Sequence, residues 1–350
     1  MRGTCLALGL ALAAAMPPAA AQETWPVDKW TPPFDYGGEA QAYSYAPLDV
    51  ATRPWRICAS YPHLKDSYWL SVNYGMVEQA RRLNVRLKVV EAGGYPNLER
   101  QKSQIAECAG TADALIVGTV SFDGLTPLIR KLAQRMPVIA AVNDVNDAGI
   151  TAKSGVSWIA MGKAIGDYFA RLHPKGQRPV KVVWFPGPRG AGWVAFVEQG
   201  FRAAVAASSA DIVAVKWGDT GFEAQLLLLE EVLEEHPDID YVIGSAVTAD
   251  AAVSLFRARG LSGRVGILAD YFTHSTYRAI KRGKVIAAPT DSPVLQGKIA
   301  LDQAVRALEG SLAVRHVGPQ IEIVDQASLA EIDIDQSLAP ASFVPVFEVK

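Results

Sequence analysis

Short apolar runs alternate with segments of helical periodicity through most of the chain. The first run spans 55–62, and in the segment at 67–84 that follows it apolar residues recur every three or four positions. Near-continuous apolar runs of this length are typical of parallel strands covered by helices on both faces. The pattern therefore predicts repeated strand–helix units. We expect further strands at 86–93, 114–118, 137–144, 180–187, 211–218, 241–246, 264–271 and 284–291, and helices at 98–110, 125–135, 158–173, 193–208, 223–237, 249–260 and 292–310.

The order of these elements predicts an α/β protein with two lobes. Each lobe begins as a doubly wound half with a parallel sheet, and a late helix and an extended tail at 317–325 follow both halves. This order fits the type I periplasmic binding fold, in which the chain crosses between the lobes three times. In that fold a late helix returns to the first lobe and a terminal strand returns to the second. We therefore expect a first lobe formed by 54–148 and 287–313, and a second lobe formed by 149–286 and 314–350.

Glycine positions separate this fold from another two-lobed class, the dinucleotide-binding oxidoreductases. Such an enzyme carries GxGxxG in its first strand-to-helix turn, whereas the turn at 59–69 reads ASYPHLKDSYW and has no glycine. A glycine-rich stretch, PGPRGAGW, occurs at 186–193 and lacks the GK[ST] ending of a phosphate-binding loop. This loop is either a tight turn or a set of backbone N–H groups that face the cleft at a helix N-terminus.

The first residues have the three parts of a secretory signal peptide. Arg2 gives a positive start, residues 6–15 form an apolar core, and alanines at 19–21 supply the small residues of a cleavage site. The apolar stretch breaks at Pro17, too early for a membrane-spanning helix. We expect residues 1–21 to be removed and the mature chain to work in the periplasm without inserting into the membrane.

Residues 22–53 differ in composition from the rest of the chain. They are rich in proline, glycine and aromatic residues and have no sustained period of 2 or 3.6. We therefore expect an irregular N-terminal extension. Exposed Trp and Tyr are common anchors of protein interfaces, so the extension either contacts a partner or packs back onto the first lobe.

Composition narrows the class of protein further. Half of the 350 residues are hydrophobic and the formal net charge is -2, which argues against disorder and against a nucleic-acid-binding surface. Cys58 and Cys108 follow the predicted signal peptide. The oxidising periplasm allows them to form a disulfide. The alternative is a pair of buried free thiols, because sequence alone does not fix the geometry that a disulfide needs.

Motifs for catalysis and metal binding are absent from the sequence. The five histidines lie far apart, and neither HExxH nor a paired metal-ligand spacing occurs. A GxSxG nucleophile elbow is also absent. We therefore expect a protein that is not an enzyme, with no catalytic residue, no metal and no cofactor.

Aromatic side chains recur where the predicted strands end. These turns are where open α/β sheets bind ligands. The aromatic residues either belong to the core or converge on a ligand, and converging ring faces favour a cationic or methylated nitrogen. Two aspartates on similar turns either cap helices or contact polar groups of the ligand. The candidate ligand-binding residues are Asp66, Tyr68, Trp69, Tyr95, Trp158, Tyr271 and Asp291.

Several long segments resemble the TorT family of type I periplasmic binding proteins. They lie at 57–82, 87–95, 155–162, 201–206, 277–288 and 338–347. The resemblance implies a non-enzymatic protein that binds trimethylamine N-oxide in the cleft and docks on the periplasmic domain of a TorS-like sensor histidine kinase. By position, the family's aromatic box resembles Trp69, Trp158 and Tyr271, with Tyr68, Tyr95 and Asp66 as polar and flanking members. The PRGAG loop with Arg189 departs from the family's pattern.

Two functions share the expected fold and cleft. In the first, lobe closure around the ligand stabilises a surface that a sensor kinase recognises, so that ligand and partner affinities are linked. In the second, the chain is the receptor of an ABC-type transporter for a small methylated amine or a sugar-like solute. A secreted α/β enzyme is a third class, and the missing catalytic motifs argue against it.

Overall fold

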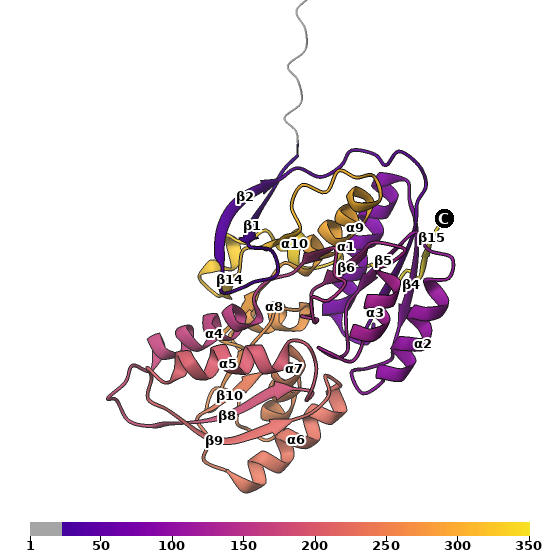
Figure 1. The fold of residues 1–350 in the computed structure, drawn as a ribbon. Helices are drawn as coiled ribbons and strands as arrows, with labels where there is room; N and C mark the ends of the chain where they lie inside the picture. Colours follow the sequence, from indigo (N-terminus) through magenta and orange to yellow (C-terminus); the bar gives the residue numbers. More distant parts are fainter. Residues whose placement is uncertain (1–22) are drawn as a thin grey trace, which may run out of the picture.

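Two α/β lobes make up the computed structural model, which describes residues 23–350 (Figure 1). The predicted signal peptide, 1–21, lies outside the described residues. The first lobe is built on a nine-stranded sheet with the order β15-β4-β3-β5-β6-β7-β13-β1-β2. The strands are β1 Trp25–Thr31, β2 Glu39–Tyr45, β3 Arg56–Tyr61, β4 Arg86–Glu91, β5 Ala114–Val117, β6 Val138–Ala141, β7 Ala152–Ser154, β13 His316–Pro319 and β15 Glu348–Val349.

The helices of the first lobe connect and cover this sheet. Strands β3 to β7 and β13 pair in parallel, so each connection between neighbours needs a crossover. Helix α9 packs closely against α1 and also contacts β5, β6 and β7. This covering explains why β5 and β6 consist entirely of buried apolar residues. The helices are α1 Ser67–Leu83, α2 Leu98–Cys108, α3 Thr126–Leu132 and α9 Pro293–Leu308.

The second lobe has a four-stranded parallel sheet with the order β11-β10-β8-β9. Its strands are β8 Val180–Gly187, β9 Ala210–Trp217, β10 Tyr241–Gly244 and β11 Gly266–Ala269. Next to β11 lies β12, Ala287–Thr290, which pairs antiparallel with β14, Glu322–Asp325. The remaining helices are α4 Trp158–Leu172, α5 Val194–Val205, α6 Phe222–Glu235, α7 Ala246–Ala258, α8 His274–Lys281, the 3-10 turn η1 Ser328–Ala330 and α10 Ile334–Ser337. The expected alternation of strands and helices is confirmed in both lobes.

Three connections carry the chain between the lobes before its final return. They follow β7, β12 and β13, and they lead into α4, α9 and β14 respectively. The return of α9 to the first lobe and of β14 to the second agrees with the order of elements, whereas the final return to β15 adds a fourth crossing that was not expected.

The expected lobe boundaries differ from the structure at the end of the chain. Residues 314–350 were assigned to the second lobe, yet β13 pairs with β7 and β1, and β15 pairs with β4. Both strands therefore belong to the first-lobe sheet, and β7, expected in the second lobe, does too. The reason is that a strand's lobe is set by its hydrogen-bonding partners, which lie far away in sequence.

The N-terminal extension is not irregular. β1 and β2 form an antiparallel hairpin, and β1 continues the first-lobe sheet by pairing with β13. The hydroxyl of Tyr45, in β2, donates a 2.6 Å hydrogen bond to the buried carboxylate of Asp302 in α9. Prolines and clustered aromatics hide the alternation of the two strands in the sequence. The pairing of β1 with β13, far along the chain, cannot be seen there either. The extension therefore packs back onto the first lobe.

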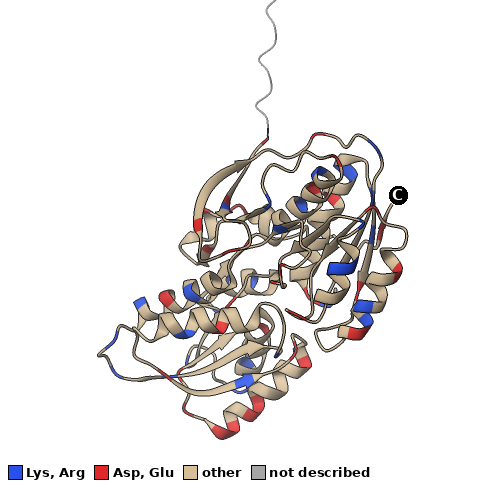
Figure 2. Ribbon diagram, viewed as in Figure 1, with Lys and Arg blue, Asp and Glu red and all other residues tan. Residues whose placement is uncertain are grey.

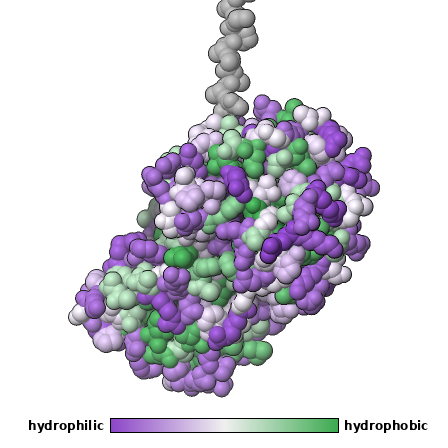
Figure 3. All heavy atoms as spheres, in the orientation of Figure 1, coloured by the Kyte–Doolittle hydropathy of each residue, from purple (hydrophilic) through white to green (hydrophobic). Residues whose placement is uncertain are grey.

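Charged and apolar residues are distributed as expected for a protein in water. Lysine, arginine and acidic residues concentrate on outward-facing helices such as α2 and α6 (Figure 2). The space-filling view shows mostly hydrophilic residues around both lobes, with hydrophobic residues exposed on the lower part of the second lobe (Figure 3). Leu227 on α6 is one exposed apolar residue. Within residues 23–350, no helix has the length and apolar character required to cross a membrane.

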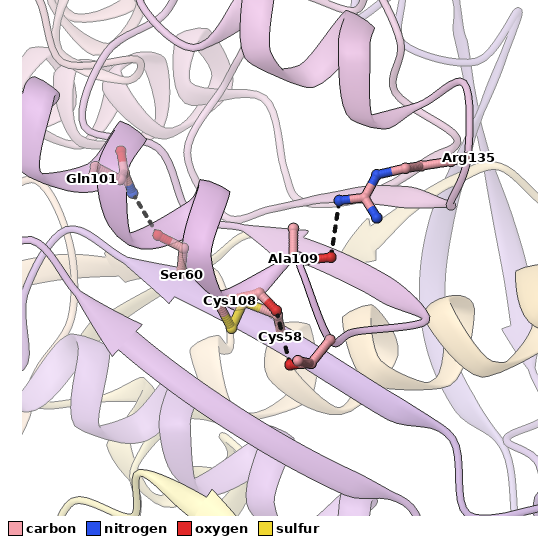
Figure 4. The surroundings of a disulfide bond; sticks show 7 residues. Cys58, Ser60, Gln101, Cys108, Ala109 and Arg135 are labelled. Atoms are coloured by element: carbon pink, nitrogen blue, oxygen red, sulfur yellow. Dashed lines mark hydrogen bonds between the residues drawn. A yellow bond between two sulfur atoms is a disulfide. The ribbon is translucent and has the colours of Figure 1, made fainter.

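Cys58 and Cys108 form a disulfide that ties β3 to the end of α2 (Figure 4). Their Cα atoms are 6.0 Å apart, which is a usual separation for bonded cysteines. Both residues are buried in a cluster of apolar side chains of the first lobe. Nearby, the side chain of Gln101 donates to Ser60 Oγ and to the carbonyl oxygen of Gly118, which fixes α2 over the ends of β3 and β5.

Candidate ligand-binding site

Nine side chains from both lobes enclose a small cavity at the carboxyl ends of the parallel strands. In this position the connections that follow neighbouring strands converge, which is why open α/β sheets bind ligands there. The first lobe and the β7–α4 crossing contribute some of the walls, and the turns after β8, β9 and β11 contribute the others. The lining residues are Asp66, Tyr68, Trp69, Tyr95, Asn143, Trp158, Trp193, Thr220 and Tyr271.

The first turn of α1 supplies three of these residues. Asp66 is the N-cap of the helix, and its Oδ1 accepts hydrogen bonds from the backbone N–H groups of Tyr68 and Trp69, both at 3.1 Å. The cap fixes the helix start, so that the two aromatic side chains that follow it are held in place. Their rings meet edge to face with centroids 6.1 Å apart. Asp66 therefore caps α1 and also lines the cavity.

Asp291 lies behind the cavity wall. Its Oδ2 accepts a 2.6 Å hydrogen bond from the Tyr68 hydroxyl and a 2.7 Å hydrogen bond from Gln296 Nε2. The residue is fully buried, and burial raises its pKa above the ordinary value. Asp291 is not a lining residue, and Ser292 takes the N-cap position of α9. Of the seven candidates, Asp291 is the one that does not line the cavity, and it holds the side chain of Tyr68 in place from behind.

Tyr95 and Asn143 form the polar end of the cavity. Asn143 Nδ2 donates to the Tyr95 hydroxyl oxygen at 3.2 Å and to the carbonyl oxygen of Thr119 at 2.8 Å. Burial raises the pKa of Tyr95 well above its ordinary value, although the neighbouring Asn143, Trp69 and Trp193 donors oppose this effect. The phenol therefore keeps its proton at all physiological pH values. Because Asn143 occupies the oxygen as an acceptor, the O–H group is free to donate to a ligand.

Aromatic rings from the crossing and from the second lobe complete the wall of the cavity. Trp158, the first residue of α4, has its indole N–H bonded to the Val142 carbonyl oxygen at 3.0 Å, which fixes the ring. Its ring centroid lies 5.4 Å from that of Trp193. Tyr271 follows β11 and meets Tyr68 of the first lobe edge to face at 5.4 Å. Rings from the two lobes are thus in direct contact.

The glycine-rich loop at 186–193 seats Trp193. A Cβ atom on Gly187 would lie 2.8 Å from the Trp193 ring, and a Cβ on Gly192 would lie 1.9 Å from the carbonyl oxygen of Asp144. Only glycine allows both approaches. The guanidinium of Arg189, which departs from the TorT pattern, lies over the ring of Trp217, 4.1 Å from its centroid. The loop therefore acts as a tight turn that brings an aromatic ring into the cleft.

The cavity is small and its aromatic walls are buried. It leaves about 20 Å³ for the centre of a water-sized sphere, and in this measure about 10–15 Å³ admits one water. Its aromatic lining residues are all at most 9% exposed. By this measure the space has the size of about one or two waters, and it is surrounded mainly by ring faces.

Two contacts between the lobes lie beside the cavity. The hydroxyl of Thr220 is 3.2 Å from His63 Nε2, and Lys65 Nζ is 2.5 Å from Asp219 Oδ2. His63 and Lys65 are in the β3–α1 turn, whereas Asp219 and Thr220 are in the β9–α6 turn. Both pairs form only when the two turns approach each other.

Sequence reasoning identified six of the lining residues and missed three. Asn143 follows β6, Trp193 follows β8 and Thr220 follows β9, so all three have the strand-end position that was used to select the others. Asn143 and Thr220 are not aromatic, and Trp193 read as the first residue of a helix. No cluster of His, Cys, Asp and Glu suited to a metal ion occurs in the described part of the chain.

Comparison with known proteins places the chain in a family. The profile of the family described as periplasmic binding proteins and sugar binding domain of the LacI family matches residues 54–344. The chain belongs to this periplasmic binding protein family. The type I fold expected from the order of elements is therefore confirmed. The resemblance to TorT is confirmed as well.

Curated and solved relatives agree with this placement. The chain is 42% identical over 301 residues to the periplasmic protein TorT of Escherichia coli K12, which covers 85% of each chain. It is 48% identical, with a TM-score of 0.80, to an ABC transporter solute binding protein from Bradyrhizobium sp. BTAi1 with bound Bis-Tris, covering 94% of this chain and 99% of that one. The TorS sensor domain–TorT complex, solved without ligand and with trimethylamine N-oxide, matches at 38% identity and a TM-score of 0.77, covering 84% of this chain and 99% of that one.

Proposed function

We propose that this periplasmic protein binds trimethylamine N-oxide in the cavity between its lobes and presents the closed form to the periplasmic domain of a TorS-like sensor histidine kinase. The observation that carries the proposal is the aromatic cage formed by rings of both lobes around a compact cavity. Three methyl groups on a positive nitrogen match ring faces, and each such contact is worth about 0.5–2 kcal/mol. The N-oxide oxygen matches the donor end formed by Tyr95.

We infer further that the chain acts by binding and not by catalysis. The cavity presents aromatic faces, hydrogen-bond donors and one carboxylate that is engaged as a helix cap. Such groups bind a ligand, and a partner can recognise the surface that lobe closure forms. Ligand and partner then both favour the closed form of the protein, so that each raises the protein's affinity for the other. The TorS sensor domain–TorT complex supports the choice of partner.

The ligand is tested by titrating the mature protein with trimethylamine N-oxide in a calorimeter, beside trimethylamine, betaine and choline. We expect the N-oxide to bind best. Trp158→Ala removes a cage wall and should weaken N-oxide binding roughly tenfold. Absence of binding, both alone and with the sensor domain present, would reject the ligand.

The sensor role is tested separately. Size-exclusion chromatography of the protein with the periplasmic domain of a TorS-like kinase should give a complex, and the N-oxide should strengthen it. Equal complex formation by wild type with and without ligand would contradict the linkage.

A second candidate function is the receptor of an ABC-type transporter for a small amine. It is favoured by the similarity to the Bradyrhizobium solute binding protein, whose bound Bis-Tris is a tertiary amine. Both functions use the same cavity, so ligand binding does not separate them. Impaired uptake of labelled ligand in cells that lack the protein would favour the transporter, whereas loss of kinase signalling with normal uptake would favour the sensor.

A further inference from the structure

The indole N–H of Trp193 is a buried hydrogen-bond donor without a partner in the described part of the chain. Its side chain lines the cavity and is 3% exposed, and its Nε1 makes no hydrogen bond. A buried indole N–H usually has a partner, because leaving it unpaired costs about 1–3 kcal/mol. Trp158, the neighbouring cage residue, follows this rule by donating to Val142.

The loop before Trp193 is constrained to hold the ring in this position. Glycines at 187 and 192 are both required, the first by the ring itself and the second by the carbonyl oxygen of Asp144. Asp144 follows the cavity residue Asn143, so the loop of the second lobe rests directly on the polar wall of the first. The unpaired donor is therefore built into the site and is not a loosely placed surface side chain.

The polar groups around Trp193 include two donors that point at the cavity. The Tyr95 hydroxyl lies close enough for the indole N–H to lower its pKa, but the distance and angle between them do not make a hydrogen bond. Asn143 already donates to that hydroxyl oxygen. Asp66 Oδ1 is engaged by two backbone N–H groups. The indole N–H and the phenol O–H thus leave a position where an acceptor atom of a ligand would meet two donors.

We propose that Trp193 determines ligand specificity by donating its indole N–H to an oxygen of the bound ligand while its ring closes the cage from the second lobe. The proposal rests on the proposed function and adds a selection rule to it. A trimethylated nitrogen that carries an oxygen satisfies the donor, whereas one that carries a fourth methyl group leaves it unpaired and buried. The site therefore prefers an amine oxide to a quaternary ammonium ion of the same shape.

The experiment compares trimethylamine N-oxide with tetramethylammonium, in which a methyl group replaces the oxygen. Calorimetry on Trp193→Phe measures how much the indole N–H contributes to ligand affinity, because phenylalanine keeps an aromatic ring and removes the N–H. We expect about a tenfold or greater loss of N-oxide affinity, in keeping with a hydrogen bond to a charged oxygen. Tetramethylammonium affinity should change by less than the N-oxide affinity.

Trp184→Phe is a matched control. Trp184 also has a buried indole N–H without a partner among the described residues, but it stacks on Phe201 in the core of the second lobe and does not line the cavity. Its replacement should leave both affinities unchanged. Thermal unfolding of both variants identifies any loss of folding, and the affinities are compared only at temperatures where each variant is folded.

A second measurement reports on the wild-type protein. With ¹⁵N-labelled tryptophan, the Trp193 indole resonance is the one missing from the Trp193→Phe spectrum. It should move downfield on adding the N-oxide and much less with tetramethylammonium. If the wild type binds the N-oxide and Trp193→Phe binds it equally well, or if both ligands are weakened equally, the donor role is overturned while the proposed function stands. If the wild type binds no N-oxide, the ligand and the inference fail together.

Discussion

The hydroxyl of Thr220, in the second lobe, lies 3.2 Å from Nε2 of His63, in the first lobe. Beside this pair, Lys65 and Asp219 form an ion pair across the same gap. Asp66, which follows Lys65, and Thr220 also line the cavity. These two contacts, which we call the latch, join the two lobes beside the site. If a ligand binds as the lobes close, its affinity includes the free energy of forming them.

Removing the ion pair should weaken ligand binding modestly. Both partners are partly exposed, with side chains 35% and 26% accessible, so screening by water limits the pair to at most about 1 kcal/mol. We expect Lys65→Ala to lower ligand affinity by no more than about fivefold. Calorimetry at low and high salt checks this, because the difference from wild type should shrink as salt rises.

Lys163→Ala is the control for this prediction. Lys163 pairs with Asp167 within α4 and on its exposed surface. Its removal takes away a similar surface ion pair without touching the latch. Equal effects of the two variants would show that the Lys65 pair does not contribute to closure.

Acidification should weaken ligand binding through His63. Burial lowers the pKa of this residue below its ordinary value in the closed form, while Lys65, Asp66, Asp219 and Glu91 act on it as charged neighbours. The open form, in which the ring meets water, then takes up a proton that the closed form resists. Affinity should be level above about pH 7 and fall as the pH drops through the ordinary histidine range near 6.5.

His63→Gln should flatten this dependence while keeping a polar partner for Thr220. Tetramethylammonium, which has no titratable proton, gives a second profile in which only the protein titrates. Asp144, whose pKa burial raises to about 6, remains in the variant. The difference between the pH profiles of wild type and variant therefore isolates His63. Parallel profiles for wild type and variant would assign the pH dependence to another group.

Asp291 should matter for stability more than for direct ligand contact. Its carboxyl group holds Tyr68 and Gln296 in a buried network. Asp291→Ala leaves the Tyr68 hydroxyl unpaired, whereas Gln296 keeps its hydrogen bond to the carbonyl oxygen of residue 291. The substitution should lower the free energy of unfolding by about 1–3 kcal/mol, measured by urea denaturation. Tyr68→Phe removes one of the two hydrogen bonds and should cost less. A fully stable Asp291→Ala protein would mean that water replaces the carboxyl group at no cost.

The disulfide should stabilise the first lobe. It closes a segment of 50 residues between β3 and α2, and disulfides typically contribute about 2–4 kcal/mol. The double variant Cys58→Ala, Cys108→Ala should therefore unfold at a lower temperature, observed by calorimetric melting. Because both residues lie on the outer side of the first lobe sheet and not at the cavity, ligand affinity measured below the melting temperature should be preserved.

The sequence by itself predicted the architecture because its parallel strands are buried on both faces. Each such strand is a local apolar run, and each helix has its own period, so β3 to β6 and α1 to α3 are visible without any distant contact. Their order then determines that the strand ends converge. For this reason Asp66, Tyr68, Trp69, Tyr95, Trp158 and Tyr271 were placed at one site from their positions alone, and all six line the cavity.

The tertiary structure decided everything that depends on a distant partner. β1 joins the first-lobe sheet through its pairing with β13, and the lobe to which β15 belongs follows from its pairing with β4. The roles of Asp291 and Trp193 were hidden for the same reason: one is set by a hydrogen bond to Tyr68 and the other by glycines that admit a ring between the lobes. Hydrophobic periodicity is a local property of the chain, whereas hydrogen-bond partners and close approaches exist only after the lobes have folded and met.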